Sequence, residues 1–336
     1  MTDPVVSVLV PTHEDAELLA LALPVFAELG RLVEVLVMNN DPAQDVPAII
    51  DSIYPDATVV EMGHDSGFGK AMNVGIQLSR GEFVLILNAD VFLSASYVPA
   101  MLQFLAEHPR AGTAGGKLLR YDLERHSRTA NIDTAGVRLG RNRRPMARGE
   151  GQLDTGRFDR EEQVFGVDSA GLFVRRAALE SIKIGDEYFD SSFFLHKEDT
   201  DLCWRLRLAG WETWFVPSAT GYHARTSRGL GERSYLSAIR RFHANSVQKS
   251  TLVQMHAMKN QWLLILKNDD AANLLRDLPF VLFREITVLL HNAIFAPRSL
   301  RAIPQFIRLI RPTREKRRHI KSNQRVSASQ MREWLG

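Results

Sequence analysis

The sequence predicts an α/β fold in which a doubly wound, Rossmann-like sheet is followed by a helical extension at the C-terminal end. Three observations lead to this prediction. Apolar runs of strand length alternate with helical patterns over about the first hundred residues, polar residues gather where several of these runs end, and helical periodicity dominates from Tyr235 onward. Strands that alternate with helices form βαβ units, and the strands of such units lie parallel in one sheet.

The bulk composition is that of a folded protein. The chain has 336 residues, of which 45% are hydrophobic and 24% charged, enough for one large core and an appendage. The single cysteine, Cys203, cannot form an internal disulfide and suits a reducing compartment. The N-terminal residues lack the basic stretch of a signal peptide, and no uninterrupted apolar run reaches the ~20 residues that cross a bilayer. We therefore expect a cytoplasmic protein.

The first half of the sheet can be predicted element by element. Apolar runs predict strands at residues 5–10, 33–38, 58–61 and 83–87. Helical spacing and turn signals predict helices at about 15–29, up to 53, and 68–79. Ligands of doubly wound sheets bind at the carboxyl ends of the strands. Because Thr12, Asn40 and Asn88–Asp90 all fall at such ends, we expect them to form one site.

The second half is less regular. Residues 120–163 lose periodicity and gain Arg, Gly and Asp, which predicts a long surface excursion that closes on a ligand. Order resumes at 164–174, followed by a helix at about 200–208 and a strand at 213–216. The remainder is expected to be helical from Tyr235 to the end.

The segment Phe83-Val84-Leu85-Ile86-Leu87-Asn88-Ala89-Asp90 carries the strongest local signal. A buried strand there ends in an amide and, two residues later, a carboxylate. Oxygen ligands of this kind hold hard divalent cations such as Mg²⁺ or Mn²⁺, so Asp90 is a candidate metal anchor. The alternative is an ordinary strand end, where Asn and Asp are common.

Glycines surround the start of the helix predicted at 68–79. Gly63, Gly67 and Gly69 allow a ligand to approach the backbone, and Lys70 lies near the positive end of the helix, which suits an anion. A tight strand-to-helix connection would explain the same residues.

Two neighbouring acids, Glu198 and Asp199, stand at the first turn of the helix predicted near 200–208. The helix dipole favours ionised carboxylates at this position. A carboxylate held in this way is a candidate general base that deprotonates a hydroxyl. Helix capping is the structural alternative.

Read in order, these segments resemble the family 2 glycosyltransferases of the GT-A fold, and most closely the bacterial rhamnosyltransferase-like branch. The resemblance covers roughly residues 5–230. Its motifs are Val8-Leu9-Val10-Pro11-Thr12, Asn39-Asn40, Gly67-Phe68-Gly69 with Asn73 and Gly75, Asn88-Ala89-Asp90, Ala170–Arg176, Glu198–Cys203, Arg207, Ala209-Gly210-Trp211 and His223. The sequence departs from the family at Asn39, usually an aspartate, at Asp65, usually an asparagine, and at His13.

The resemblance implies a role for each matching residue. Asp90 and His223 would bind the divalent cation, Asp199 would be the catalytic base and Glu198 its neighbour. The residues implied to bind the nucleotide sugar are Pro11, Thr12, Glu14, Asn40, Asp65, Lys70, Asn88 and Ala89. Gly171 and Trp211 would contact the acceptor.

The implied protein is an inverting, metal-dependent glycosyltransferase that builds cell-surface polysaccharide. Its expected donor is a nucleotide-diphosphate sugar, with dTDP-rhamnose first and a UDP-sugar second, and its expected acceptor is a glycan or a polyprenyl-linked sugar. A GT-A domain would span 1–232, with a nucleotide-sugar half at about 1–120 and an acceptor half at 121–232. A non-catalytic nucleotide-sugar-binding protein remains an alternative. A sugar-nucleotide pyrophosphorylase is disfavoured because Pro11-Thr12-His13-Glu14 replaces its Gly-rich loop.

The region 233–336 is expected to be helical and basic. Between Arg298 and Arg325 it has ten Lys and Arg residues against one acid, Glu315. Apolar residues at helical spacing beside arginines suit a helix lying on a membrane, and they equally suit packing on the catalytic domain or in a homodimer. We expect peripheral attachment to the cytoplasmic face of the inner membrane. No nucleic-acid partner is expected, since recognised binding motifs are missing from the basic cluster.

Overall fold

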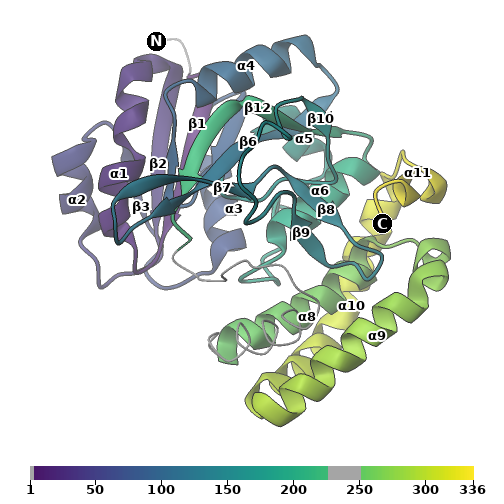
Figure 1. Cartoon of the computed structure of the whole chain (residues 1–336). Coiled ribbons are helices and arrows are strands. Elements are labelled where there is room, and N and C mark those ends of the chain that lie inside the picture. The colour runs from purple at the N-terminus through teal and green to yellow at the C-terminus, as the bar shows by residue number, and fades with distance from the viewer. Residues whose placement is uncertain (1–3, 226–250) are drawn as a thin grey trace.

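The computed structural model describes residues 4–225 and 251–336. The expected domain boundary at 232/233 and the expected helix start at Tyr235 lie outside these residues. One ten-stranded sheet dominates the fold, in the order β10-β12-β6-β11-β4-β1-β2-β3, with β5 paired to β12 and β7 paired to β6 (Figure 1). Its strands are β1 (Val6–Thr12), β2 (Val33–Asn39), β3 (Thr58–Glu61), β4 (Phe83–Ile86), β5 (Val91–Leu93), β6 (Ala111–Asp122), β7 (Ser127–Thr134), β10 (Glu162–Gln163), β11 (Leu172–Arg175) and β12 (Glu212–His223).

The four strands predicted from apolar runs form the parallel half of this sheet. β1 lies between β2 and β4 and is parallel to both, and β3 is parallel to β2. Since side chains alternate along a strand, Val8 and Val10 enter one core cluster and Leu9 enters the other. β11 runs antiparallel to both β4 and β6, so the complete sheet is mixed.

Helices cover both faces of the sheet. α1 (Leu19–Ala22), α2 (Val46–Ile53) and α4 (Tyr97–Glu107) contribute buried residues to the cluster that contains Val8. α3 (Phe68–Leu78), α5 (Arg176–Ser181) and α6 (Glu198–Leu208) contribute to the cluster that contains Leu9. The expected doubly wound, Rossmann-like arrangement is therefore confirmed.

Two local predictions are wrong. The helix expected at 15–29 consists of short turns, η1 (Ala16–Leu18), α1 and η2 (Pro24–Leu32), because Pro24 lacks the amide hydrogen that a continuing helix needs. The excursion expected at 120–163 contains strands. β6 continues to Asp122 and returns antiparallel as β7, and β8 (Val137–Leu139) pairs with β9 (Pro145–Ala147). Each pairing joins two consecutive strands, and the apolar periodicity of a single segment does not report which neighbour it pairs with.

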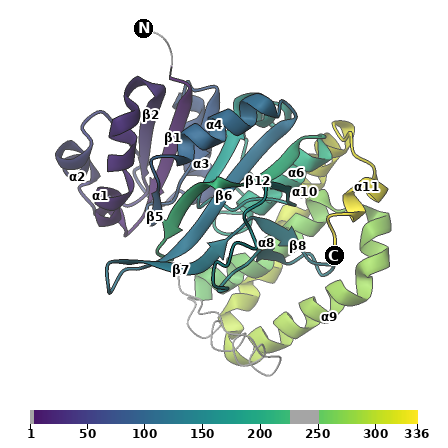
Figure 2. The same ribbon diagram turned by 45° about the horizontal axis from the view of Figure 1, so that its top comes forward.

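The C-terminal helices share a core with the sheet region. They are α8 (Thr251–Asn268), α9 (Ala271–Phe295), η3 (Pro297–Arg301), α10 (Ala302–Ser322) and α11 (Ala328–Arg332). Leu263 and Leu264 of α8 and Ile320 of α10 lie in one buried cluster with Phe193 and Trp204. Figures 1 and 2 both show α9 along the outer edge, farther from the parallel strands than α8. The described C-terminal helices therefore pack on the sheet region as part of the same fold.

Candidate active site

The carboxyl ends of β1, β2 and β4 meet at one edge of the sheet, as predicted. The amide of Asn40 donates to the carbonyl of Thr12 at 3.0 Å. The Asn40 side-chain oxygen accepts from the amide and hydroxyl of Ser66, at 3.2 and 2.8 Å. These bonds connect the end of β1, the end of β2 and the loop before α3. The three segments together form one side of the candidate site.

The turn after β1 belongs to the same side of the candidate site. The Thr12 hydroxyl donates to Asp15 Oδ1 at 2.7 Å. Burial raises the pKa of Asp15, and the negative charge of Asp90 adds to this effect, so the turn lies beside the end of β4. Pro11 is half-buried and Glu14 is exposed in a left-handed conformation with a φ of 61°. Pro11 and Glu14 are thus both at least partly accessible to solvent.

The loop before α3 presents its remaining predicted residues to solvent. Asp65 is exposed, and its Oδ1 accepts from the amide of Gly67 at 3.0 Å. Lys70 is exposed in the first turn of α3. Asn39, which replaces the usual family aspartate, donates to Glu61 Oε2 at 2.9 Å. Its polar side chain is therefore engaged within the parallel sheet.

Asp90 lies opposite His223, at the turn that follows β4. Asn88 is half-buried there, and its carbonyl accepts from the amide of Val91 at 3.1 Å, while Ala89 is fully buried. Oδ1 of Asp90 is 3.3 Å from Nε2 of His223, the last residue of β12. The two residues predicted to bind metal are thus brought together by strands far apart in the chain.

Asp133 holds the other side of the same imidazole, and sequence reasoning missed it. Its Oδ2 is 2.8 Å from Nδ1 of His223, and its Oδ1 accepts from Arg225. Asp133 is fully buried at the end of β7. Nδ1 is thus directed at Asp133 and Nε2 at Asp90. Burial opposes the charged ring, but the hydrogen bonds to these two carboxylates outweigh it and raise the pKa of His223 to about 10. The only signal in the sequence was an acid within a segment interpreted as irregular.

Asp168 connects this cluster to the proposed base. Burial raises the pKa of Asp168 to about 6; the negative charges of Asp133 and Asp199 add to the rise, and the positive charge of His223 opposes it. The next residue, Ser169, donates its backbone N–H to the Asp199 carboxylate. Asp90 and Asp199 are therefore linked electrostatically through His223, Asp133 and Asp168.

The two acids at the start of α6 have different environments. Burial raises the pKa of Glu198 to about 8, and the charge of Asp199 adds to the rise. Glu198 Oε2 has no hydrogen-bond partner among the described residues. Asp199 is half-buried, its pKa is raised mainly by burial, and its Oδ1 accepts from the amide of Thr200 at 2.6 Å. Asp199 is thus the acid better suited to be ionised near neutral pH.

The loop that leads into these acids is strained and is held by α8. Phe194, His196 and Lys197 have positive φ angles of 65°, 69° and 75°, which cost energy in non-glycine residues. The side-chain amide of Asn260 donates to the carbonyls of Phe193, Leu195 and His196 at 2.9, 2.7 and 2.8 Å. A helix of the C-terminal region therefore fixes the conformation of the loop that carries Glu198 and Asp199.

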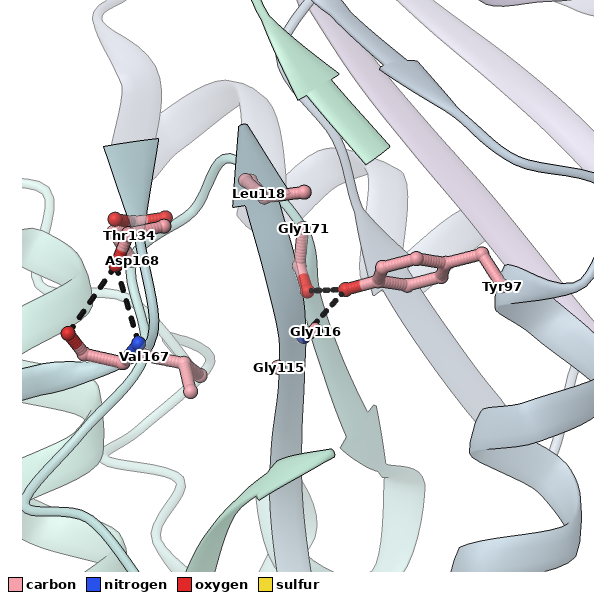
Figure 3. Close-up of a pocket in the computed structure, with 9 residues that line it drawn as sticks. Tyr97, Gly115, Gly116, Leu118, Thr134, Val167, Asp168 and Gly171 are labelled. Carbon is pink, nitrogen blue, oxygen red and sulfur yellow. Dashed lines mark hydrogen bonds between the residues drawn. The ribbon is translucent and has the colours of Figure 1, made fainter. Parts of the chain in front are cut away.

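Gly171 lines a small cavity beside this cluster, and Trp211 does not. The cavity is bounded by Gly171, Tyr97 and Asp168 together with β6 residues, and Figure 3 shows Tyr97 and Asp168 approaching from opposite sides. The Tyr97 hydroxyl donates to the Gly171 carbonyl at 2.6 Å. Trp211 precedes β12, at the opposite end of that strand from His223, and donates to Ser181 at 2.8 Å. The structure therefore does not bring Trp211 together with the other predicted residues.

The donors at Asp90 and His223 fit a divalent cation. Their facing atoms are 3.3 Å apart, about the spacing of two neighbouring ligands of one ion with bonds of ~2.1 Å. Asp133 supplies the carboxylate–histidine arrangement that accompanies metal-binding imidazoles. The described residues contain no group of three or more such side chains placed to hold an ion. Phosphate oxygens and water would therefore supply the remaining ligands.

Solved structures with the same fold identify its class. The S. aureus protein TarS, residues 1–349, solved with UDP-GlcNAc, matches 98% of this chain and 92% of its own, with a TM-score of 0.55 at 17% identity. Mannosyltransferase PcManGT from Pyrobaculum calidifontis, solved with GDP-Man and Mn²⁺, matches 96% of this chain and 86% of its own, with a TM-score of 0.50 at 18% identity. The fold is therefore that of the GT-A glycosyltransferases, with a helical C-terminal region.

The family follows from sequence. The model of glycosyl transferase family 2 matches residues 7–182, and the chain belongs to that family. The N-acetylglucosaminyl-diphospho-decaprenol L-rhamnosyltransferase of Mycobacterium tuberculosis is 28% identical over 261 residues, which are 71% of this chain and 82% of the relative. The expected GT-A fold and the expected family are both confirmed.

Proposed function

We propose that the chain transfers a sugar, with inversion, from a nucleotide-diphosphate donor to a glycan or lipid-linked acceptor, and that it needs a divalent cation. The observation that carries this proposal is the contact of Asp90 with His223 and the electrostatic link from this pair through Asp168 to Asp199. A donor phosphate at one end and an acceptor hydroxyl at the other would lie in one site. Inversion needs a single displacement, with the base and the leaving group on opposite sides of the anomeric carbon.

The cation, Mg²⁺ or Mn²⁺, would be held by Asp90 and His223. When bound, it would neutralise the charge that develops on the departing diphosphate. Asp133 keeps the Nε2 atom of His223 directed at Asp90. Lys70, exposed at the N-terminal turn of α3, adds positive charge for the same phosphates.

Asp199 would accept the proton of the acceptor hydroxyl as that oxygen attacks the anomeric carbon. Its pKa, raised mainly by burial, makes it a stronger base than an ordinary aspartate. Glu198, with a pKa of about 8, stays protonated beside it and so adds no second negative charge. Asn260 and the other α8 contacts hold the loop that orients Asp199.

The donor is proposed to be dTDP-rhamnose, with a UDP-sugar as the second candidate. Pro11, Thr12, Glu14, Asn40 and Asp65 would surround the base and ribose, and Asn88 and Ala89 would lie along the diphosphate. Support comes from the rhamnosyltransferase relative, which is 28% identical. Gly171, in the cavity beside Asp168, would leave room for the acceptor.

The acceptor is proposed to be a polyprenyl-linked sugar, because the same relative acts on N-acetylglucosaminyl-diphospho-decaprenol. Such an acceptor stays in the bilayer, so the enzyme would work at the cytoplasmic face of the membrane as a peripheral protein. A homodimer at that surface is compatible with this proposal.

A thermal-shift screen of nucleotide sugars with Mn²⁺ or Mg²⁺ tests the donor. We expect dTDP-rhamnose with Mn²⁺ to raise the Tm most, and a chelator to abolish the shift. Transfer to a short-chain polyprenyl-diphospho-N-acetylglucosamine, followed by NMR of the anomeric centre, tests reaction and stereochemistry. Retention of configuration, or full activity in chelator, would refute the mechanism.

A further inference from the structure

α9 buries several polar residues and exposes most of its large apolar ones. The residues that face the protein include Asn273, Asp277, Glu285 and Asn292, all buried. The exposed large side chains along the same helix are Leu275, Phe280, Leu282, Phe283, Ile286, Leu290, Ile294 and Phe295. A helix that packs on a core and faces water has the opposite arrangement. An exposed apolar face of this length indicates a surface that meets an apolar environment.

Buried polar contacts fix this orientation. Asp277 accepts from Arg141 and Arg143 at 2.8 and 2.9 Å, and Arg143 and Asp277 have fully buried side chains. Trp262 of α8 donates to Glu285 at 2.7 Å. Rotating α9 to bury its apolar side would break these pairs and leave Arg143 with Asp269 as its one remaining carboxylate partner among the described residues, which is costly for a buried charge network. The apolar face is therefore held outward.

The apolar face continues past the end of α9. Ile303 and Ile307 at the start of α10 are exposed. Arginines lie next to them in the chain, and Arg298, Arg301, Arg308 and Arg311 are all exposed. Exposed apolar side chains flanked by arginines match the acyl boundary and the anionic phosphates of a lipid surface.

We propose that α9, together with the first turns of α10, is a membrane-docking surface that lies in the plane of an anionic bilayer. The proposal deepens the proposed function, because a lipid-linked acceptor would be held in the same bilayer. By length and composition, α9 could also cross a membrane. Crossing would place the Arg143–Asp277 pair in hydrocarbon or break it, so the in-plane arrangement is favoured.

Vesicle flotation tests the surface. We expect the full chain to float with vesicles of phosphatidylcholine and phosphatidylglycerol, and more weakly with phosphatidylcholine alone. Phe283→Glu and Leu290→Glu should each weaken flotation about tenfold or more, because each removes a large apolar side chain from the lipid. Leu153→Glu is the matched control, since Leu153 is 60% exposed outside the C-terminal helices. Equal binding by the control and the α9 variants would overturn the proposal.

The arginines and the depth of α9 can be tested separately. Arg308→Glu with Arg311→Glu should abolish the preference for phosphatidylglycerol. Leu275→Cys and Leu290→Cys, each labelled with an environment-sensitive dye, should report the same shallow depth at both ends of α9. Native Cys203 is fully buried and should not react with the dye. A deep position at one end with a water-exposed position at the other would show a crossing helix and overturn the proposal.

A second copy of the chain is the competing occupant. Sedimentation equilibrium should find a monomer in the absence of vesicles. A dimer that Phe283→Glu dissociates, together with no flotation, would assign the face to self-association and overturn the proposal. Transfer to a water-soluble acceptor analogue should be unchanged in Phe283→Glu. Loss of flotation with retained transfer therefore tests this surface alone, and a chain that floats without transferring sugar would refute only the proposed function.

Discussion

Asp133 lies 2.8 Å from Nδ1 of His223 and thereby directs Nε2 of that ring at Asp90. The contact joins β7, from a segment with no sequence periodicity, to the end of β12. It makes a buried acid part of the proposed cation site without touching the ion.

Asp133→Ala should weaken Mn²⁺ binding by ~10–100-fold, the usual effect of losing such a supporting carboxylate. Direct titration by electron paramagnetic resonance measures this without reference to turnover. Asp133→Asn keeps an acceptor for Nδ1 and should fall between Ala and the natural chain. Unchanged Mn²⁺ affinity in both variants would show that Asp133 is only structural.

Asp199→Asn should reduce sugar transfer by ~10²–10⁴-fold, because the amide cannot accept the acceptor proton. Donor binding, measured by calorimetry with Mn²⁺, should stay nearly the same. The assignment of the base fails if the variant loses donor binding yet keeps its single-turnover transfer rate.

Asn260→Ala should lower kcat by roughly tenfold or more while leaving donor affinity nearly unchanged. The three carbonyls that Asn260 holds precede Glu198 in a strained loop, and small displacements of a catalytic group slow the reaction strongly. Asn273→Ala is a matched control, because Asn273 is also fully buried and donates to Ala328 at 2.7 Å, away from the loop. If both variants lower kcat equally, the effect is general destabilisation.

Glu198→Gln should stabilise the fold at alkaline pH. Burial raises the pKa of Glu198 from 4.5 to about 8, so the folded chain keeps a proton that the unfolded chain releases. This contribution to stability is fully present below pH 4.5 and is lost as the pH rises through about 8. Glutamine does not titrate, so the variant should gain on the order of a few kcal/mol over the natural chain at pH 9. Denaturant melts across pH 4–9 check this, and a difference that does not grow with pH would contradict it.

The parallel half of the fold was predictable because each strand is a continuous apolar run that local pattern reports. The same runs placed Thr12, Asn40 and Asp90 at one edge, since parallel strands end together. The metal-binding role expected for His223 came from the family resemblance. Its pairing with Asp90 could not be predicted without knowing that β5 and β12 are neighbours.

Other features of the fold and of the candidate site could not be predicted from local sequence patterns. Asp133 has no sequence signature, because its role depends on β7 returning along β6. The hydrogen bonds from Asn260 to the 193–197 loop depend on how α8 packs against that loop. The apolar residues of α9 were visible in the sequence, but which side faces outward is decided by Asp277 and its distant partner Arg143.

The buried cluster that mixes Phe193 and Trp204 with Leu263, Leu264 and Ile320 also limits how this enzyme can diversify. A recombination that exchanged everything after residue 250 for the tail of a relative would introduce foreign side chains beneath the 193–197 loop. New acceptor preferences should therefore arise by substitutions on the outer surface of these helices or by replacement of the whole chain. Exchange of the C-terminal region alone should not produce them.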